Sequence, residues 1–548
     1  MSLRPLNTQS ELFSTAALTG QVFAPTDRYR LFAEKIYPLL VRTREEVAKT
    51  YCPDNGRPGI EPVWLLGTSL LQYLEGMPDR QAVEMLQYHV GWNLALNRTV
   101  GQEVFHPTVL VYFRKRLIEH ELSAVVFAGI LDGLVEAGLI ERRCRQRLDS
   151  TQMMGLVARM SRLENVRETL RLALKEVQET ATMFTVATWW TQVWDRYVGS
   201  KLDYRATAGQ LAEKMGQAGI DGLQVMAWAK SLSDPTVVEG PQMKLLARVL
   251  EENFTWEENK TPLQREAQPA GAVHNPHDPD AQWAAKGQGK HKKEHVGYKV
   301  QVAETVVIQP LAPGEPTRSF LTGIVTQPAI SSDDAGNRQM DMEQEKMGLD
   351  SREKYVDAAY VSAERLLEAQ AQGKELIGPA KSGPVRDNRF SVDDFDVRVE
   401  ERKAICPAGQ VSTQCSRLEE AETGKVSYRF EWSTHCRSCP LKVKCVNPKQ
   451  KHRSLVVSQN HTILQARRRE QKTEAFKEKA KLRNAIEGTQ SELVRAHGLR
   501  HARYRGLNKV RLQNYLIGAA CNVKRWIKRI IWECKARQTS LQPAAMSG

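Results

Sequence analysis

The chain has 548 residues and a formal net charge of +14, with 41% hydrophobic and 26% charged residues, a balance that excludes a wholly disordered chain and favours several folded domains. No uncharged apolar run approaches the roughly 18–20 residues of a membrane span, and the first residues lack a signal-peptide pattern, so we expect a cytoplasmic protein without membrane partners. Nine unevenly spaced cysteines argue against a disulfide framework.

The first part of the chain is predicted to be helical. Apolar residues recur at three-to-four spacing over residues 29–40, 63–74 and 109–117, and Asp79 is predicted to cap a further helix between them. Several short helices, the last of them basic, fit a helix-turn-helix-like DNA reader, and they fit a plain helical bundle or dimerisation module equally well. We therefore predict an N-terminal DNA-binding or dimerisation domain over residues 1–135.

Helices and strands alternate in the central part of the chain. A first strand is predicted within residues 136–161, followed by a helical insert over 162–265, in which a cluster of tryptophans is expected to be core. Period-two spacing and short apolar runs then predict strands at 296–303, 319–326, 354–357 and 375–379. Helical spacing predicts helices between them at 335–348 and 361–370. This order predicts an α/β core of ribonuclease-H-like type. The helical insert interrupts the core after its first strand, and residues 266–388 complete it.

Three segments complete the predicted layout: a small Cys-bearing insertion over 389–457, basic C-terminal helices over 458–535 and a disordered tail over 536–548. From residue 451 to the end there are 22 Lys and Arg against 6 Glu and no Asp, a net charge of +16, so one end of the chain holds the whole positive excess. Aromatic residues are interleaved with this charge, which favours phosphate contact and base stacking over a merely solvated basic helix.

Three carboxylates stand where they suit a metal site. Asp149 and Asp357 are predicted to close two core strands, which are neighbours in a ribonuclease-H-like sheet, and Glu487 lies on a predicted helix in the most basic region. Taken singly, Asp149 fits a turn or cap and Asp357 a helix cap equally well. Together the three acids predict a site for Mg²⁺ or Mn²⁺, since such ions prefer oxygen ligands, beside a phosphate backbone.

Four cysteines form a second candidate metal site. Cys436 and Cys439 make a C-x₂-C pair, and Cys406 and Cys445 lie within about forty residues of each other on either side of it. This spacing favours a structural Zn²⁺, with Cys415 as a competing fourth ligand and a reduced, metal-free insertion as the alternative.

A loop before residue 296 is also rich in metal-ligand types. Because it is rich in Pro, Gly and Lys as well, a solvated, DNA-facing role is favoured over a metal site. The residues concerned are His274, His277, Asp278 and Asp280.

The ordered set of these segments resembles the DDE transposases of bacterial insertion sequences, in the branch with an N-terminal helical domain and a Cys-bearing insertion. The resemblance spans about residues 25–530. It rests on Leu148-Asp149-Ser150-Thr151, on Gly297-Tyr298-Lys299-Val300, on Val356-Asp357-Ala358-Ala359-Tyr360, on Arg483 with Ile486-Glu487-Gly488, and on residues 498–507. Some of these enzymes have a Tyr where Ala480 stands and a Lys where Val494 stands, so this chain lacks their fuller signature.

The resemblance implies that Asp149, Asp357 and Glu487 are the catalytic acids of a metal-dependent enzyme that cuts the inverted-repeat ends of its element and joins them to target DNA. It implies double-stranded DNA as the substrate, a homodimer and association with the nucleoid. DNA contacts are expected from Arg483, Arg495, Arg500, Arg503, Tyr504 and Arg505. A same-fold nuclease and a non-catalytic DNA-binding regulator are the alternatives, and retention of all three acids argues against the regulator.

Overall fold

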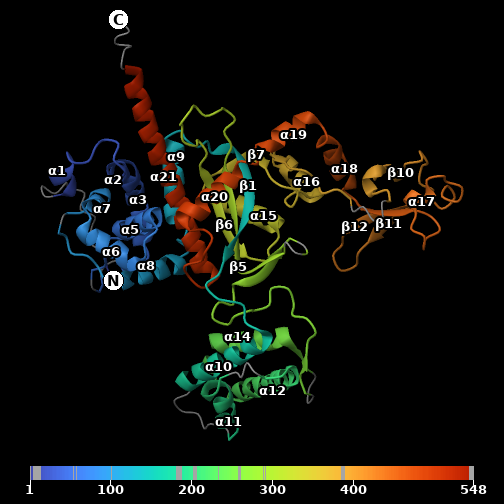
Figure 1. The fold of residues 1–548 in the computed structure, drawn as a ribbon, viewed down its shortest axis with the longest axis horizontal. Helices are drawn as coiled ribbons and strands as arrows, with labels where there is room; N and C mark the ends of the chain where they lie inside the picture. The colour runs from blue at the N-terminus through green and yellow to red at the C-terminus, as the bar shows by residue number, and fades with distance from the viewer. Residues whose placement is uncertain are drawn as a thin grey trace.

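The computed structural model describes residues 2–3, 14–52, 55–56, 58–99, 101–180, 188–201, 206–232, 234–256, 261–287, 289, 292–383 and 389–541. Figure 1 shows an N-terminal helical domain, a central α/β core, a helical insert that projects from one end of the core, and a small strand-rich module beyond an arm of helices. Within the described ranges, no helix has both the length and the apolar character needed to cross a membrane.

The N-terminal domain is a bundle of short helices around one buried helix, α5 (Pro62–Glu75). Pro62 opens α5, and Gly76, in the left-handed conformation (φ 73°), ends it. The other helices are α1 (Thr15–Thr19), α2 (Arg28–Leu31), α3 (Tyr37–Arg42), α4 (Arg44–Ala48), α6 (Asp79–Tyr88), α7 (Val90–Ala95), α8 (Thr108–Glu119) and α9 (Val125–Glu136), with a π-helical turn at Phe32–Ile36. The prediction of helices in this region is confirmed, but Asp79 is the first residue of α6 and not its cap, because its carboxylate binds Gln72 and Arg114 instead.

The core is a mixed sheet in the order β6, β5, β1, β7, β8, with β4 also on the outer edge of β5. β5 is antiparallel to β1 and to β6, whereas β7 and β8 run parallel to β1. The strands are β1 (Arg143–Met154), β4 (Gln282–Lys286), β5 (Lys293–Thr305), β6 (Leu321–Pro328), β7 (Asp350–Tyr355) and β8 (Glu375–Ile377). This mixed α/β sheet is consistent with the predicted ribonuclease-H-like core.

Helices cover both faces of the sheet. On one face, α15 (Asp333–Lys346) and α16 (Ala363–Ala371) pack on residues such as Leu148 and Val325. On the other lie α20 (Ile486–His497) and the 35-residue α21 (Leu507–Leu541), which also packs on α5 and α9 and so joins the core to the N-terminal domain (Figure 1).

The tail predicted to be disordered from residue 536 continues instead as helix to Leu541, since a formed helix extends at one hydrogen bond per residue and the first proline is Pro543. Residues 542–548 lie outside the described residues.

The insert and the Cys module each have a core of their own. The insert consists of α10 (Arg162–Thr180), α11 (Trp190–Trp194), a π-helical turn (Asp195–Gly199), α12 (Ala208–Ser231), α13 (Pro235–Val238), α14 (Pro241–Asn253), β2 (Phe254–Thr255) and β3 (Leu263–Gln264). Its tryptophans pack against its other apolar side chains, as predicted. The module consists of a 3₁₀ turn (Val392–Asp394), β9 (Asp396–Arg398), β10 (Lys403–Ile405), β11 (Gln414–Glu419), β12 (Val426–Glu431), α17 (Lys442–Cys445) and β13 (Ser454–Ser458). α18 (His461–Glu470) and α19 (Glu474–Lys481) lead back to α20.

Candidate active site

Asp149, on β1, and Asp357, two residues beyond the end of β7 and not at the strand end that the sequence predicted, lie at the same level of neighbouring chain segments. β1 and β7 are parallel, with Arg147 opposite Tyr355. Asp149 follows Arg147 by two residues, and Asp357 follows Tyr355 by two residues. Asp149 stands inside β1 and not at the strand end that the sequence predicted, because β5 pairs with β1 as far as Met154. Burial raises the pKa of Asp149, and the nearby Asp357 carboxylate adds to this rise. Two such acids are most stable with a cation between them.

Backbone amides orient both carboxylates. The Ser150 amide donates to Asp149 Oδ1 at 2.7 Å, and the Ala359 amide donates to Asp357 Oδ1 at the same distance. The second contact closes a turn directly after β7, which the buried Tyr360 anchors by donating its hydroxyl to Gln301 at 2.6 Å. The acids are therefore held in place before any ligand binds.

Glu487 belongs to the first turn of α20, and two neighbours tie this turn to β1. Arg483, four residues earlier, places its Nη1 3.0 Å from Asp149 Oδ2, and Gln490, three residues later, donates to the Ser150 carbonyl at 3.3 Å. Gln490 lies one helical turn after Glu487 and shares its face of α20, so Glu487 lies on the flank of the helix towards Ser150. The Glu487 side chain is exposed, and the three carboxylates do not all come within 4.8 Å of one another. Arg483 itself precedes the helix, in the turn before Ile486, and pairs with a catalytic candidate.

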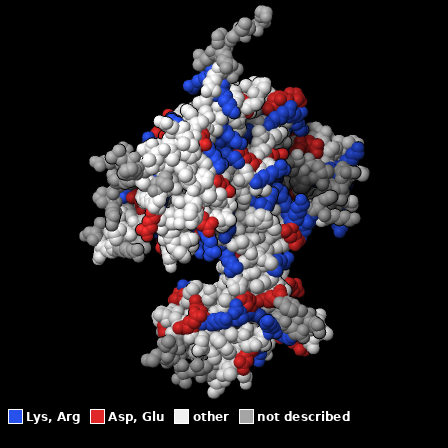
Figure 2. Space-filling view, turned by 60° about the vertical axis from the view of Figure 1, so that its left-hand side comes forward, with Lys and Arg blue, Asp and Glu red and all other residues white. Residues whose placement is uncertain are grey.

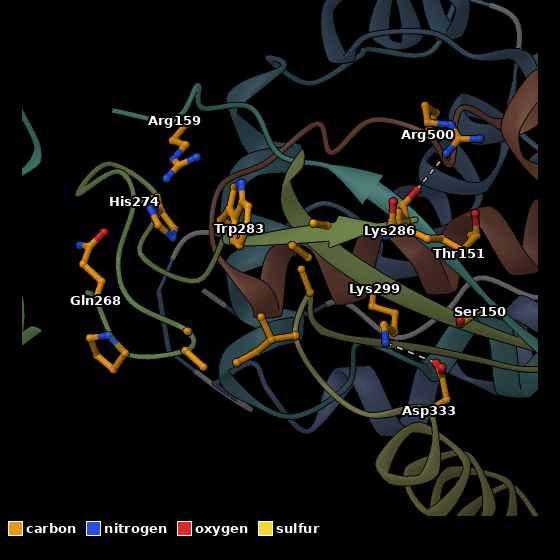
Figure 3. A pocket seen from close by; sticks show the side chains of 18 of the residues that line it. Ser150, Thr151, Arg159, Gln268, His274, Trp283, Lys286, Lys299, Asp333 and Arg500 are labelled. Carbon is orange, nitrogen blue, oxygen red and sulfur yellow. Dashed lines mark hydrogen bonds and ion pairs between the residues drawn. The ribbon is translucent and has the colours of Figure 1, made fainter. Parts of the chain in front are cut away.

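A polar groove of about 920 Å³ begins beside these acids at Ser150 and Gln490 and runs to the base of the insert. Figure 3 shows basic side chains from several elements along it: Arg159, Lys286, Lys299 and Arg500. Lys299 pairs with Asp333 at 3.3 Å, and the Arg159 guanidinium lies 5.2 Å from the centre of the Trp283 ring. Sequence reasoning missed Arg159, a single residue in the segment after β1, and Trp283, which lies on the short strand β4, because neither carries a periodic signal.

Two regions of the chain match families of known proteins. Residues 405–527 match the family described as "Transposase DDE domain", and residues 20–116 match "Transposase domain (DUF772)". The chain is an insertion-sequence DDE transposase by family. The first match includes Glu487 and the four candidate zinc ligands, whereas Asp149 and Asp357 lie in the part of the core before it. No curated protein matches the transposase.

Apart from Arg483, which pairs with Asp149, the predicted DNA-contacting residues fall into two groups. Arg495, Arg500 and Arg505 are exposed, and Arg500 lines the groove and donates to the Gln152 carbonyl at 3.3 Å. Figure 2 shows a band of Lys and Arg running down the middle of one face towards the narrow connection to the insert.

Arg503 and Tyr504 instead face the N-terminal domain. Arg503 donates to the Met77 carbonyl at 3.2 Å and stacks 4.7 Å from the Tyr73 ring centre, and Tyr504 lies 5.2 Å from the Arg114 guanidinium. These contacts occupy both side chains inside the protein, so of these five residues only Arg500 lines the groove.

Asp278 and Asp280, in the loop before β4, bond to the backbone of the C-terminal segment, and Asp278 is not the solvated, DNA-facing residue that the sequence predicted. Asp278 is fully buried and accepts the Tyr298 hydroxyl at 2.7 Å and the Gly506 amide at 3.1 Å. Asp280 accepts the Leu507 amide at 2.9 Å, at the start of α21. The loop therefore fastens the base of the insert to the C-terminal helix, a role that only the three-dimensional arrangement reveals.

The four predicted zinc ligands line one small cavity in the Cys module: Cys406, Cys436, Cys439 and Cys445. Burial raises the pKa of Cys445 to about 11, and the other three thiols, being close, raise it as well. The Arg453 amide donates to Cys436 Sγ at 3.5 Å, an outer contact of the kind that thiolate sites use. Cys415 lies instead on β11 opposite Phe430. The geometry thus groups the four and leaves Cys415 out.

One set of three ligand atoms within 4.8 Å of one another occurs among the described residues, at Glu492, His497 and Cys521. Arg525 already donates to Glu492 Oε2 at 2.8 and 3.0 Å. A guanidinium in contact with a carboxylate opposes a cation there, so we assign no ion to this set.

Proposed function

We propose that the protein cuts the inverted-repeat ends of its element and joins the freed 3′ ends to target DNA, with Asp149, Asp357 and Glu487 as the catalytic acids. The observation that carries this proposal is the juxtaposition of the two aspartates with the turn of α20 that bears Glu487. A divalent ion such as Mg²⁺ or Mn²⁺, when bound by these acids, would activate the attacking oxygen and stabilise the leaving one.

The side chains of the protein would position the DNA. Arg483 would release Asp149 and bind a phosphate at the transposon end, which a guanidinium can grip with two hydrogen bonds. The basic groove beside the acids would take the adjoining strand through Arg159, Lys286 and Arg500, whose charges suit its phosphates. Fixed positive groups near the scissile phosphate would also stabilise charge that builds up in the transition state.

Two structural features would support this chemistry. The four thiols of the Cys module, which line one cavity, would hold one structural Zn²⁺, for which their number and ligand type are suited. Two element ends must be brought together, so a homodimer bound to double-stranded DNA would be the active form.

A strand-transfer assay with paired element ends, target DNA and Mg²⁺ tests the proposal. Joined products should form with the parent and fall roughly 10³-fold or more in Asp149→Asn, Asp357→Asn and Glu487→Gln. Circular dichroism should show these variants to be folded. Cleavage without joining would point to a nuclease, and DNA binding without cleavage by the parent would contradict the assignment of catalysis.

A further inference from the structure

A buried carboxylate that no part of the proposed chemistry uses lies behind the site. Glu304 on β5 has no solvent exposure, and its cross-strand partner is Arg147, two residues before Asp149 on the same face of β1. Arg147 Nε donates to Glu304 Oε1 at 2.6 Å, and Arg525 of α21 donates to Glu304 Oε2 at 2.9 Å. One acid thus holds two buried guanidinium groups.

Each of the two arginines reaches an element that carries catalytic machinery. Arg147 donates through Nη1 to the Leu482 carbonyl at 3.2 Å, directly before Arg483, which pairs with Asp149. Arg525 donates to the Thr489 hydroxyl at 2.8 Å and to Glu492 at 2.8 Å, two residues on the helix that bears Glu487.

Thr489 closes the network. Its hydroxyl donates to Glu304 Oε2 at 2.7 Å while it accepts from Arg525, so α20 is bonded to the carboxylate directly as well as through the guanidinium. Thr489 lies two residues after Glu487 and one before Gln490, which bonds to β1. The positive charges of Arg147 and Arg525 balance the negative charges of Glu304 and Glu492. Buried charged groups are tolerated when they are paired and hydrogen-bonded in this way.

We propose that Glu304 is a positioning residue for catalysis: through Arg147, Arg525 and Thr489 it fixes the turn with Arg483 and the helix with Glu487 against β1, and so sets how the three acids meet around a divalent ion. The inference rests on the proposed function for the identity of the site. Outer contacts of this kind typically change metal affinity or activity by about 10–100-fold when they are removed.

The test is a Mn²⁺ titration of the full-length protein with a non-cleavable duplex of the element end, followed by the electron paramagnetic resonance signal of free Mn²⁺. Asp149→Asn defines the site-specific part of the binding. Glu304→Gln, which keeps the shape and removes the charge, should weaken that part about tenfold or more. The pair Thr489→Val and Thr489→Ser separates the hydroxyl from the fold, and the Val variant should weaken Mn²⁺ binding while the Ser variant should match the parent.

The control for general destabilisation is Asp221→Asn. Asp221 is a buried carboxylate of the insert that accepts the Tyr197 hydroxyl at 2.6 Å and pairs with Arg196, far from the acids. This variant should lower the melting temperature yet leave the Mn²⁺ titration unchanged.

Equal Mn²⁺ affinity in the parent, Glu304→Gln and Thr489→Val would overturn the proposal. So would an Asp221→Asn variant that loses as much affinity as Glu304→Gln. Because the readout needs no cleavage, a parent that binds Mn²⁺ without cutting DNA would refute the proposed function while still deciding the role of Glu304.

Discussion

We expect Arg483 to have two roles, which its replacement by alanine separates. Without a metal ion its guanidinium is the counter-ion of Asp149, whose carboxylate stands next to Asp357. With a metal ion and DNA bound, it is free to hold a phosphate. Arg483→Ala should therefore destabilise the metal-free protein, and Mg²⁺ should restore part of the lost stability.

The size of the effect follows from the contact. The two charged atoms lie 3.0 Å apart, and the Arg483 and Asp149 side chains are 22% and 18% exposed. At an effective dielectric constant of about 20 the Coulomb attraction is roughly 5–6 kcal/mol. Desolvation and lost side-chain freedom reduce the net contribution of such a bond to about 1.5–3 kcal/mol. Loss of this contribution lowers the melting temperature of a domain of this size by about 3–12 °C. If the bond moves to a phosphate in the transition state, its loss slows cleavage by about 10- to 150-fold.

The assay compares thermal unfolding of the parent and Arg483→Ala in EDTA and in saturating Mg²⁺, together with cleavage rates at one DNA concentration. Arg483→Lys is the matched control, because it keeps a charge but not the two-pronged geometry. A melting-temperature gap that is the same with and without Mg²⁺ would refute the idea that arginine and ion compensate the same carboxylate.

Three further predictions concern other parts of the protein. Burial raises the pKa of Asp149, so protonated Asp149 stabilises the fold below the ordinary carboxyl pKa, and this stabilisation is lost as the pH rises through the raised value. Metal-free Asp149→Asn should therefore melt above the parent at pH 7 and level with it near about pH 3. Elemental analysis should find about one zinc per chain, lost in Cys436→Ser and kept in Cys415→Ser, and an equal loss in both would contradict the four-thiol grouping. Arg500→Ala should weaken DNA binding in a filter-binding assay and reduce the slope of log affinity against log salt concentration by about one. Arg503→Ala should chiefly lower the melting temperature. The opposite pattern in the two assays would reverse these assignments.

The sequence predicted the α/β character of the core and the helical N-terminus because both depend on local periodicity. Alternation in residues 296–303 and helical spacing in residues 335–348 are each recorded in a few neighbouring side chains, and the structure has β5 and α15 there. The placement of Asp149 was less accurate, because the length of β1 depends on its pairing with β5, which lies more than a hundred residues further along the chain.

Other features could not be predicted, because they depend on contacts between distant segments. The composition of residues 498–507 is that of a DNA-binding surface, yet Arg503 and Tyr504 meet the N-terminal domain, since the segment is held between Met154 and Asp278. Nothing in the sequence near Glu304 indicates that it joins β1, α20 and α21. A charged residue in a strand is usually solvated, and only the fold shows this one to be enclosed.

Metal-specificity rescue would show whether Asp149, Asp357 and Glu487 hold the same divalent ions. Cleavage of an end-bearing duplex would be measured for Asp357→Cys in Mg²⁺ and in Mn²⁺, because a thiolate accepts Mn²⁺ more readily than Mg²⁺. We expect Asp357→Cys to lose cleavage in Mg²⁺ and to recover it in Mn²⁺, with no recovery in Asp357→Ala. Equal activity of Asp357→Cys in both ions, or equal recovery in Asp357→Ala, would contradict a role of this carboxylate as a metal ligand.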